Sequence, residues 1–143
     1  RAFDGFHVGD DLETSQDEAN LAVPVFSIST GKILQVSTVG GYGGLLVAQY
    51  HFSGQDVTVY YGHLDLSNTT VKAGDTLAVG EKIGNLGKSC SSQTDGERKH
   101  LHFAIHKGTT VDIRGYVRSE QELSLWLGPS IFLQALGATE STR

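Results

Sequence analysis

Short runs of apolar residues, separated by polar turns that contain glycine, recur between about residue 23 and residue 117. Runs of this length, rich in β-branched and aromatic residues and alternating with polar ones, predict β-strands, and the glycine-rich breaks predict the tight turns that join them. The strands predicted in this way span residues 23–29, 32–38, 45–53, 56–64, 76–79, 82–86, 100–106 and 110–117. We therefore expect a mainly β protein, built as a compact antiparallel sheet or sandwich.

The pattern changes after residue 118. Ser119 and Glu122 have the spacing of a capping box, and leucines follow at helical intervals. Pro129 opens a second apolar segment at the position where proline favours the start of a helix. The sequence thus predicts a short helical tail over about residues 119–138, with Trp126 packing it onto the sheet.

Length and composition narrow the class of protein. The chain has 143 residues, which fits one domain over residues 1–143, with a core of about 6–117 that is large enough to need no staple. The single cysteine, Cys90, excludes an internal disulfide and lies in a polar run typical of an exposed thiol. The net charge is −5 and no basic patch stands out, which argues against a nucleic-acid-binding protein.

No apolar run approaches the roughly 20 residues of a membrane span. Because the chain starts at Arg1 without a methionine, we expect it to be an excised piece, from which an export signal or an anchor could have been removed.

The segment KHLHFAIH, residues 99–106, carries most of the candidate chemistry. Alternate side chains of a strand point to opposite faces, so one face collects apolar residues and the other collects imidazoles. The apolar face holds Leu101, Phe103 and Ile105, and the imidazole face holds His100, His102 and His106. Two interpretations fit this segment alone: a half-buried strand whose polar face is rich in histidine, or a metal or catalytic site on a rigid strand.

Two further segments contain candidate ligands. In FHVGDD, His7 and Asp11 are four residues apart, about 13 Å on a straight strand, which is too far for one ion bound at about 2 Å. Gly9 between them permits the bend that would bring both to one metal. In YYGHLD, His63 stands at the end of a strongly β-like run, where a partly buried, hydrogen-bonded histidine is the purely structural interpretation.

Together these segments suggest a hydrolytic zinc site. Catalytic zinc commonly takes three ligands from His, Asp or Glu and leaves one position to water, whose pKa falls towards about 7. Two further imidazoles could accept a proton or stabilise an oxyanion. The candidates are His7, Asp11, His63, His100 and His102, whereas His51 and His106 receive a structural role.

Five motifs in order carry a family resemblance. They are His-x-Gly-x-Asp at residues 7–11, VPVFSISTGKI, GGYGGLLVAQYHFSGQDVTVYYGHL, VKAGDTLAVGEKIGNLG and HLHF at residues 100–103. The chain resembles the lysostaphin-type zinc metallopeptidases, which are peptidoglycan endopeptidases of bacterial cell walls. The resemblance covers about residues 6–112, and WLGPSIFL is similar to a closing segment of the family.

The resemblance implies that His7, Asp11 and His102 bind Zn²⁺ and that His63 and His100 assist without binding it, with the general base left open between the two. It implies a monomeric zinc endopeptidase that hydrolyses peptide cross-links or bridges of peptidoglycan, outside the cell or in the cell envelope. Which peptide bond is cut stays open.

Departures from the family pattern point to the substrate groove. The loop over residues 88–99 is longer than usual, and Lys99 stands where proline is common. The acidic stretch over residues 13–20 predicts a solvated loop.

Two other functions fit parts of the sequence. A catalytically inactive adaptor of cell-wall hydrolases would share the fold, but such members typically lose a ligand and this chain keeps all three. A carrier-type β module resembles VKAGDTLAVGEKIG, but no suitably exposed lysine follows that segment.

Overall fold

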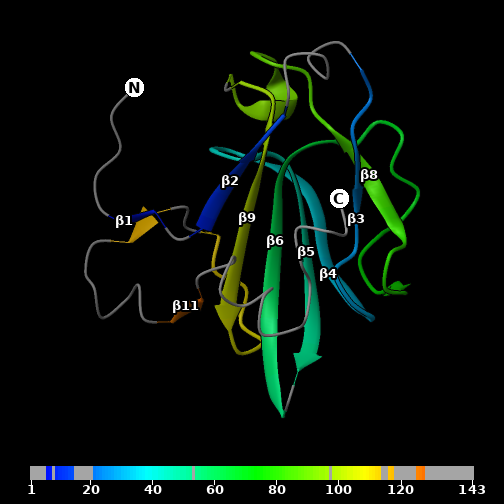
Figure 1. Ribbon diagram of the computed structural model, residues 1–143, viewed down its shortest axis with the longest axis vertical. Helices are drawn as coiled ribbons and strands as arrows, with labels where there is room; N and C mark the ends of the chain where they lie inside the picture. Colours follow the sequence, from blue (N-terminus) through cyan, green and yellow to red (C-terminus); the bar gives the residue numbers. More distant parts are fainter. Residues whose placement is uncertain are drawn as a thin grey trace.

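The computed structural model describes residues 6–7, 9–14, 21–52, 54–96, 98–113, 116–117 and 125–127. Its main feature is a curved sheet in which all the described strand pairs are antiparallel (Figure 1). In spatial order the central path runs through β11 (Trp126–Leu127), β9 (His100–Lys107), β6 (Gln55–Asp65), β5 (Gly43–Phe52), β4 (Gly31–Val39) and β7 (Thr76–Leu77).

Three more strands extend this sheet. β2 (Gly9–Glu13) pairs with the edge of β9, and β8 (Lys82–Leu86) pairs with both β6 and β3 (Pro24–Phe26). A separate two-stranded sheet joins β1 (Phe6–His7) to β10 (Tyr116–Val117). The chain therefore changes sheets between residues 7 and 9, next to the glycine at which the sequence predicted a bend.

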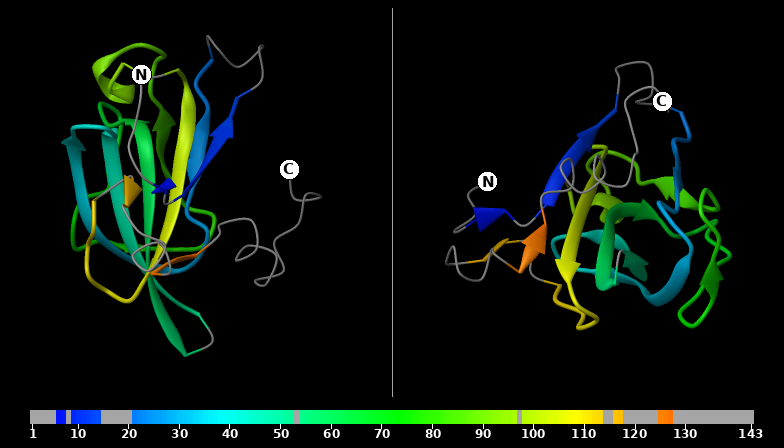
Figure 2. Two further views of the ribbon diagram at one scale, coloured as in Figure 1. Left: turned by 90° about the vertical axis from the view of Figure 1, so that its left-hand side faces the viewer. Right: turned by 60° about the horizontal axis from the view of Figure 1, so that its bottom comes forward.

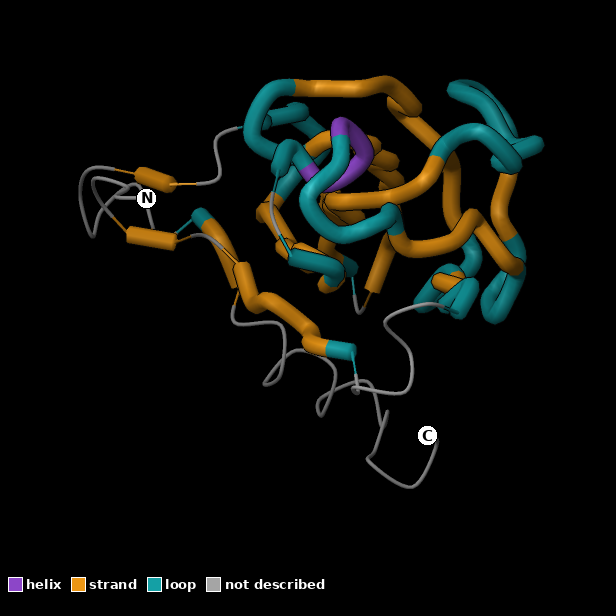
Figure 3. Tube along the Cα trace, turned by 90° about the horizontal axis from the view of Figure 1, so that it is seen from above, coloured by secondary structure: helices purple, strands orange, loops and turns teal. Residues whose placement is uncertain are grey.

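Both faces of the central strands are buried. The sheet curls on itself, as the tilted view of Figure 2 and the view from above in Figure 3 show. The main core inside the curl includes Tyr61, Phe103 and Ile105, whereas a second cluster on the opposite face includes Tyr60 and Ala104. Neighbouring residues of β6 and β9 thus alternate between two apolar layers, which explains why these strands read as nearly continuous hydrophobic runs.

The predicted fold class is confirmed, and most predicted strands are present with shifted ends. One predicted strand, 110–117, is wrong in part, because residues 110–113 form no strand. Of its described residues, Tyr116–Val117 pair with β1. In the unpaired part, the Asp112 backbone N–H donates to the Tyr60 hydroxyl at 2.5 Å. A side chain from the sheet, rather than a neighbouring strand, therefore holds this segment.

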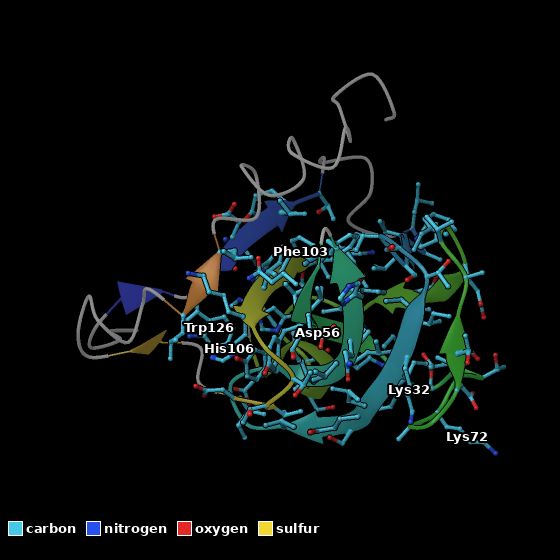
Figure 4. All side chains as sticks on the ribbon, turned by 90° about the horizontal axis from the view of Figure 1, so that it is seen from below. Lys32, Asp56, Lys72, Phe103, His106 and Trp126 are labelled. Atoms are coloured by element: carbon cyan, nitrogen blue, oxygen red, sulfur yellow. The ribbon has the colours of Figure 1, made fainter. Side chains whose placement is uncertain are left out.

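Of the predicted helical tail, residues 119–124 and 128–138 lie outside the described residues. Trp126 and Leu127 form strand β11 against β9 instead of a helical turn, because the indole packs against Tyr60 and His106 (Figure 4). The core role predicted for Trp126 is confirmed, since the residue is 6% exposed. Across the described parts of the chain, no helix has the length and apolar character needed to cross a membrane.

Candidate functional site

The pairing of β2 with β9 brings the first acidic motif to the histidine strand. Asp11 lies opposite His102, and Glu13 lies opposite His100. Residues two apart on a strand share a face, so both acidic side chains lie on the same face as both imidazoles. The Oδ1 atom of Asp11 is 3.4 Å from Nδ1 of His102 and 3.5 Å from Nε2 of His100. One carboxylate oxygen therefore faces two imidazoles that come from the far end of the sequence.

A β-bulge turns His63 towards this face. Opposite β5, Gly62 pairs with Leu45 and Leu64 pairs with Gly44, so His63 is an extra residue in β6. Simple alternation would put His63 on the inner face with Tyr61, but the bulge leaves Leu64 in the main core and frees the imidazole to point to the other side. His63 also has φ 65°, a left-handed conformation that non-glycine residues rarely adopt and that often marks a functional position.

The backbone around His63 is held on both sides. Its N–H donates to the carbonyl oxygen of Tyr42 at 2.8 Å, and its carbonyl oxygen accepts from the N–H of Gly87 at 2.7 Å. These two hydrogen bonds offset the cost of the left-handed conformation and fix the position of the backbone from which the His63 side chain extends.

The three imidazoles form one buried cluster. The ring centroid of His63 lies 4.4 Å from that of His100 and 6.3 Å from that of His102. All three residues are at most 4% exposed, and the ring of Tyr42 packs edge-on against His102 with centroids 5.2 Å apart. Within the described part of the chain, His63 Nδ1 is buried without a hydrogen bond, so this nitrogen is available to a ligand.

The surroundings shift the pKa values of His63 and His100 in opposite directions. Burial, followed by the neighbouring His100 and His102, lowers the pKa of His63 to about 4. Burial also tends to lower the pKa of His100, but hydrogen bonds to Asp11 and to the Arg98 carbonyl outweigh it and raise the pKa. Without a bound cation, His63 is therefore neutral at pH 7, and His100 holds a proton more readily. Two imidazoles with opposite shifts are typical of acid–base sites.

The spacing of Asp11 and His102 fits a metal. Two ligands bound to zinc at about 2.0–2.2 Å in tetrahedral geometry lie about 3.3–3.5 Å apart. The 3.4 Å between Asp11 Oδ1 and His102 Nδ1 matches this separation, and so does the 3.5 Å between Asp11 Oδ1 and His100 Nε2. The described side chains contain no group of three His, Cys, Asp or Glu that could hold a metal ion. The side chain of His7, the third ligand expected from sequence, lies outside the described residues.

The other sequence candidates fall as follows. His51 is largely exposed and its Nδ1 lies 2.6 Å from Asp56, at the hairpin that joins β5 to β6. His106 is buried against Trp126 and faces Thr58 across the sheet (Figure 4). The structural role of His51 and His106 stays a prediction, and Cys90 is exposed as expected.

Sequence reasoning missed three neighbours of the site. The pattern predicts the turn at Tyr42 but no contact with the site, and it puts Glu13 in a solvated loop and Arg98 in the long loop over residues 88–99. Glu13 is instead the last residue of β2, and the Arg98 side chain bonds to it. The register of β2 was the missing information, because it alone puts Glu13 opposite His100.

Comparisons with known proteins agree with this architecture. A family model described as peptidase family M23 matches residues 5–113. No curated protein sequence matches the chain significantly. Among solved structures, that of LytU superposes with a TM-score of 0.63 at 22% identity, covering 94% of this chain and 77% of that one.

Two structures of lysostaphin are also similar. A solution structure shares 28% identity with a TM-score of 0.58, covering 85% of this chain and 42% of that one. The antimicrobial peptidase lysostaphin from Staphylococcus simulans shares 24% identity with a TM-score of 0.61, covering 95% of this chain and 50% of that one. The family model spans most of the chain, including β2, β6 and β9, the strands that carry the imidazole cluster and Asp11. This chain therefore belongs to peptidase family M23.

Proposed function

We propose that this protein is a zinc-dependent endopeptidase that hydrolyses peptide cross-links or bridges of bacterial peptidoglycan. The observation that carries the proposal is the convergence of His100 and His102 on one carboxylate oxygen of Asp11, with the ring of His63 packed at a tilt against His100. Membership of a peptidase family supports the hydrolytic reading, and lysostaphin, a structural neighbour, is described as an antimicrobial peptidase.

In this proposal His7, Asp11 and His102 hold the zinc ion. Bound there, Zn²⁺ would polarise the carbonyl of the scissile peptide and lower the pKa of a water molecule towards neutrality. The ligand role of Asp11 and His102 is supported by their separation and by their donor types, one carboxylate and one imidazole.

His63 and His100 would accept and donate protons during hydrolysis and would stabilise the tetrahedral intermediate by hydrogen bonding. The Nδ1–H of His100 donates to the backbone carbonyl of Arg98 at 2.7 Å, which leaves Nε2 to face the reaction. His63 is neutral at pH 7, so one of its ring nitrogens donates a hydrogen bond and the other accepts one. Either imidazole could be the general base, and burial of both keeps bulk water from competing.

We further propose that residues 1–143 act as one catalytic domain, as a monomer, outside the cell or in the cell envelope. The location follows from the proposed substrate, because peptidoglycan lies outside the cytoplasmic membrane.

The direct test combines metal analysis with digestion of cell walls. We expect the purified protein to contain zinc and to release defined muropeptides, identified by mass spectrometry, and a chelator to abolish the release. The variants His102→Ala and His63→Ala should each lose activity, the first with its zinc and the second without losing zinc.

His51→Ala is the matched control, because it removes an exposed imidazole next to Asp56 rather than one of the buried cluster. Full activity in His102→Ala or His63→Ala would contradict the proposal. A metal-free protein that cleaves nothing, but stimulates another wall hydrolase regardless of chelator, would favour the adaptor function instead.

A further inference from the structure

Arg98 joins the two acidic residues of β2 that face the site. Its Nε donates to Oε1 of Glu13 at 2.9 Å, and its Nη2 donates to Oε2 of the same carboxylate. The same Nη2 lies 3.9 Å from Oδ2 of Asp11. One guanidinium therefore donates two hydrogen bonds to Glu13 and lies at ion-pair distance from Oδ2 of Asp11.

The backbone of Arg98 reaches a second member of the site. Its carbonyl oxygen accepts the hydrogen bond from His100 Nδ1 at 2.7 Å. This bond fixes the ring so that Nε2, and not Nδ1, lies 3.5 Å from Asp11 Oδ1. A single residue thus contacts Asp11 through its side chain and His100 through its main chain.

The segment that presents Arg98 is firmly attached. The backbone N–H of Lys99 donates to Ser89 Oγ at 2.8 Å, and its carbonyl accepts from Thr14 Oγ1 at 3.4 Å. The Lys99 ammonium is buried and donates to the carbonyl oxygen of Leu21. At the other side of the loop, the 3₁₀ turn η2 (Ser92–Thr94) is closed by a capping box at Ser91. Arg98 is therefore presented at a defined position on the rim of the site.

Stability alone does not account for this arrangement. The side chains of Arg98 and Glu13 are 57% and 52% exposed, and exposed ion pairs contribute about 0–1 kcal/mol. A carboxylate that binds a metal through one oxygen usually has the other oxygen held by a neighbouring group. Asp11 has this arrangement, with Oδ1 towards the imidazoles and Oδ2 towards Arg98.

Glu13 has a second effect. An Arg⁺ beside a divalent cation would repel it, but the Glu13 carboxylate neutralises the guanidinium and holds its Nη2 at ion-pair distance, 3.9 Å, from Asp11 Oδ2.

We propose that Arg98, held by Glu13, is a positioning residue that fixes the Asp11 carboxylate and the His100 imidazole for cation binding and for peptide hydrolysis. Both parts rest on the proposed function, cation binding on the zinc site at Asp11 and hydrolysis on the activity, and the two are measured separately. Neither residue touches the reacting atoms, and both act through their neighbours.

The test measures zinc affinity of the full chain by competition with a chromophoric chelator, alongside the melting temperature of the metal-free protein. For Arg98→Gln we expect zinc affinity to fall about tenfold or more, the usual effect of losing a partner of a ligand, with little change in melting temperature. The zinc affinity of Arg98→Lys should lie between those of the wild type and Arg98→Gln, because lysine keeps the positive charge but cannot form the two parallel hydrogen bonds of a guanidinium. Lys72→Gln is the matched control, since it removes one exposed positive charge that is well separated from Phe103 of β9 (Figure 4).

A double-mutant cycle separates the two partners. Glu13→Gln should also weaken zinc binding, because the released guanidinium competes for Asp11, but the double variant should bind zinc no worse than Arg98→Gln. At saturating zinc, Arg98→Gln should lower kcat on peptidoglycan peptides with KM unchanged.

Zinc affinity in Arg98→Gln within twofold of wild type, or tighter, would overturn the inference. So would a loss of affinity that only follows a large drop in melting temperature, since that indicates a structural anchor. If the wild type binds zinc but cleaves no peptide, the proposed function fails while the zinc measurements still decide this inference.

Discussion

Gly62 offers a sensitive test of how the site is packed. It lies in β6 opposite His102 of β9, where the strand backbone approaches closely. A Cβ added at this position would lie 2.9 Å from Cδ1 of Tyr42 and 3.1 Å from Cβ of His102. Both separations are shorter than ordinary van der Waals contact. In Gly62→Ala, either the tyrosine ring or the histidine must therefore move.

The expected size of the effect follows from two opposing contributions. Forcing an extra methyl into a packed interior costs about 1–3 kcal/mol. Restricting the unfolded chain by replacing glycine recovers roughly 0.4–1 kcal/mol. We therefore expect a net loss of about 1–2 kcal/mol, which lowers the melting temperature by roughly 2–8 °C. If His102 binds zinc as proposed, its displacement should also weaken zinc binding by about tenfold.

The assay is urea unfolding of the metal-free protein together with a zinc titration. Gly40→Ala is the matched control, because a Cβ there meets no atom within 4 Å and its backbone is not left-handed. It should be as stable as wild type or slightly more stable. Gly62→Ala should cost less in a Tyr42→Ala background, because the ring that it meets has been removed. The reasoning is refuted if Gly62→Ala unfolds at the same urea concentration as Gly40→Ala and binds zinc like wild type.

Three further outcomes are expected. Burial raises the pKa of Tyr60 to about 12 from its ordinary 10, so the unfolded chain loses this proton first. Tyr60 should then contribute a loss of about 1.4 kcal/mol of stability per pH unit between pH 10 and 12, in addition to the losses from the buried Tyr42, Tyr50 and Tyr61, and Tyr60→Phe should reduce the slope by that amount in urea unfolding series. Zinc at about 100 times its Kd should stabilise the protein by about 2.7 kcal/mol in calorimetry, and Asp11→Asn should abolish most of the gain. Phe103 is 2% exposed and packs against Tyr61, so Phe103→Ala should lower the free energy of unfolding by about 3–5 kcal/mol. A loss under about 1 kcal/mol would contradict the core position of Phe103.

The parts of the fold that depend on local pattern could be predicted. The alternation in KHLHFAIH gave both the strand and its two faces, and β9 has Phe103 and Ile105 in the main core with His100 and His102 on the other side. The spacing of apolar runs and glycine turns was equally informative, because each strand of a curled antiparallel sheet must bury one face.

The parts of the fold that depend on contacts between residues distant in sequence could not be predicted. Alternation assigns His63 to the wrong face, since nothing in YYGHLD shows that Gly44 and Leu45 of the neighbouring strand accommodate an extra residue. Trp126 has helical spacing with the leucines before it, but the edge of β9 and the rings of Tyr60 and His106 make the strand more favourable. Tertiary packing outweighs local propensity at both positions.

The candidate site depends on the register between β2 and β9 more than on any single side chain. His100 and His102 share a face whatever strand lies beside them. A slip of one residue in β2, however, would put Asp10 or Leu12 opposite His102 and turn the Asp11 side chain to the other face of the sheet. Gly9 resists such a slip at one end, because a Cβ there would lie 2.4 Å from the Phe103 carbonyl oxygen, so no other residue of β2 fits that place. The Glu13–Arg98 ion pair resists it at the other end. A pair that contributes little to global stability can thus still determine whether the carboxylate faces the imidazoles.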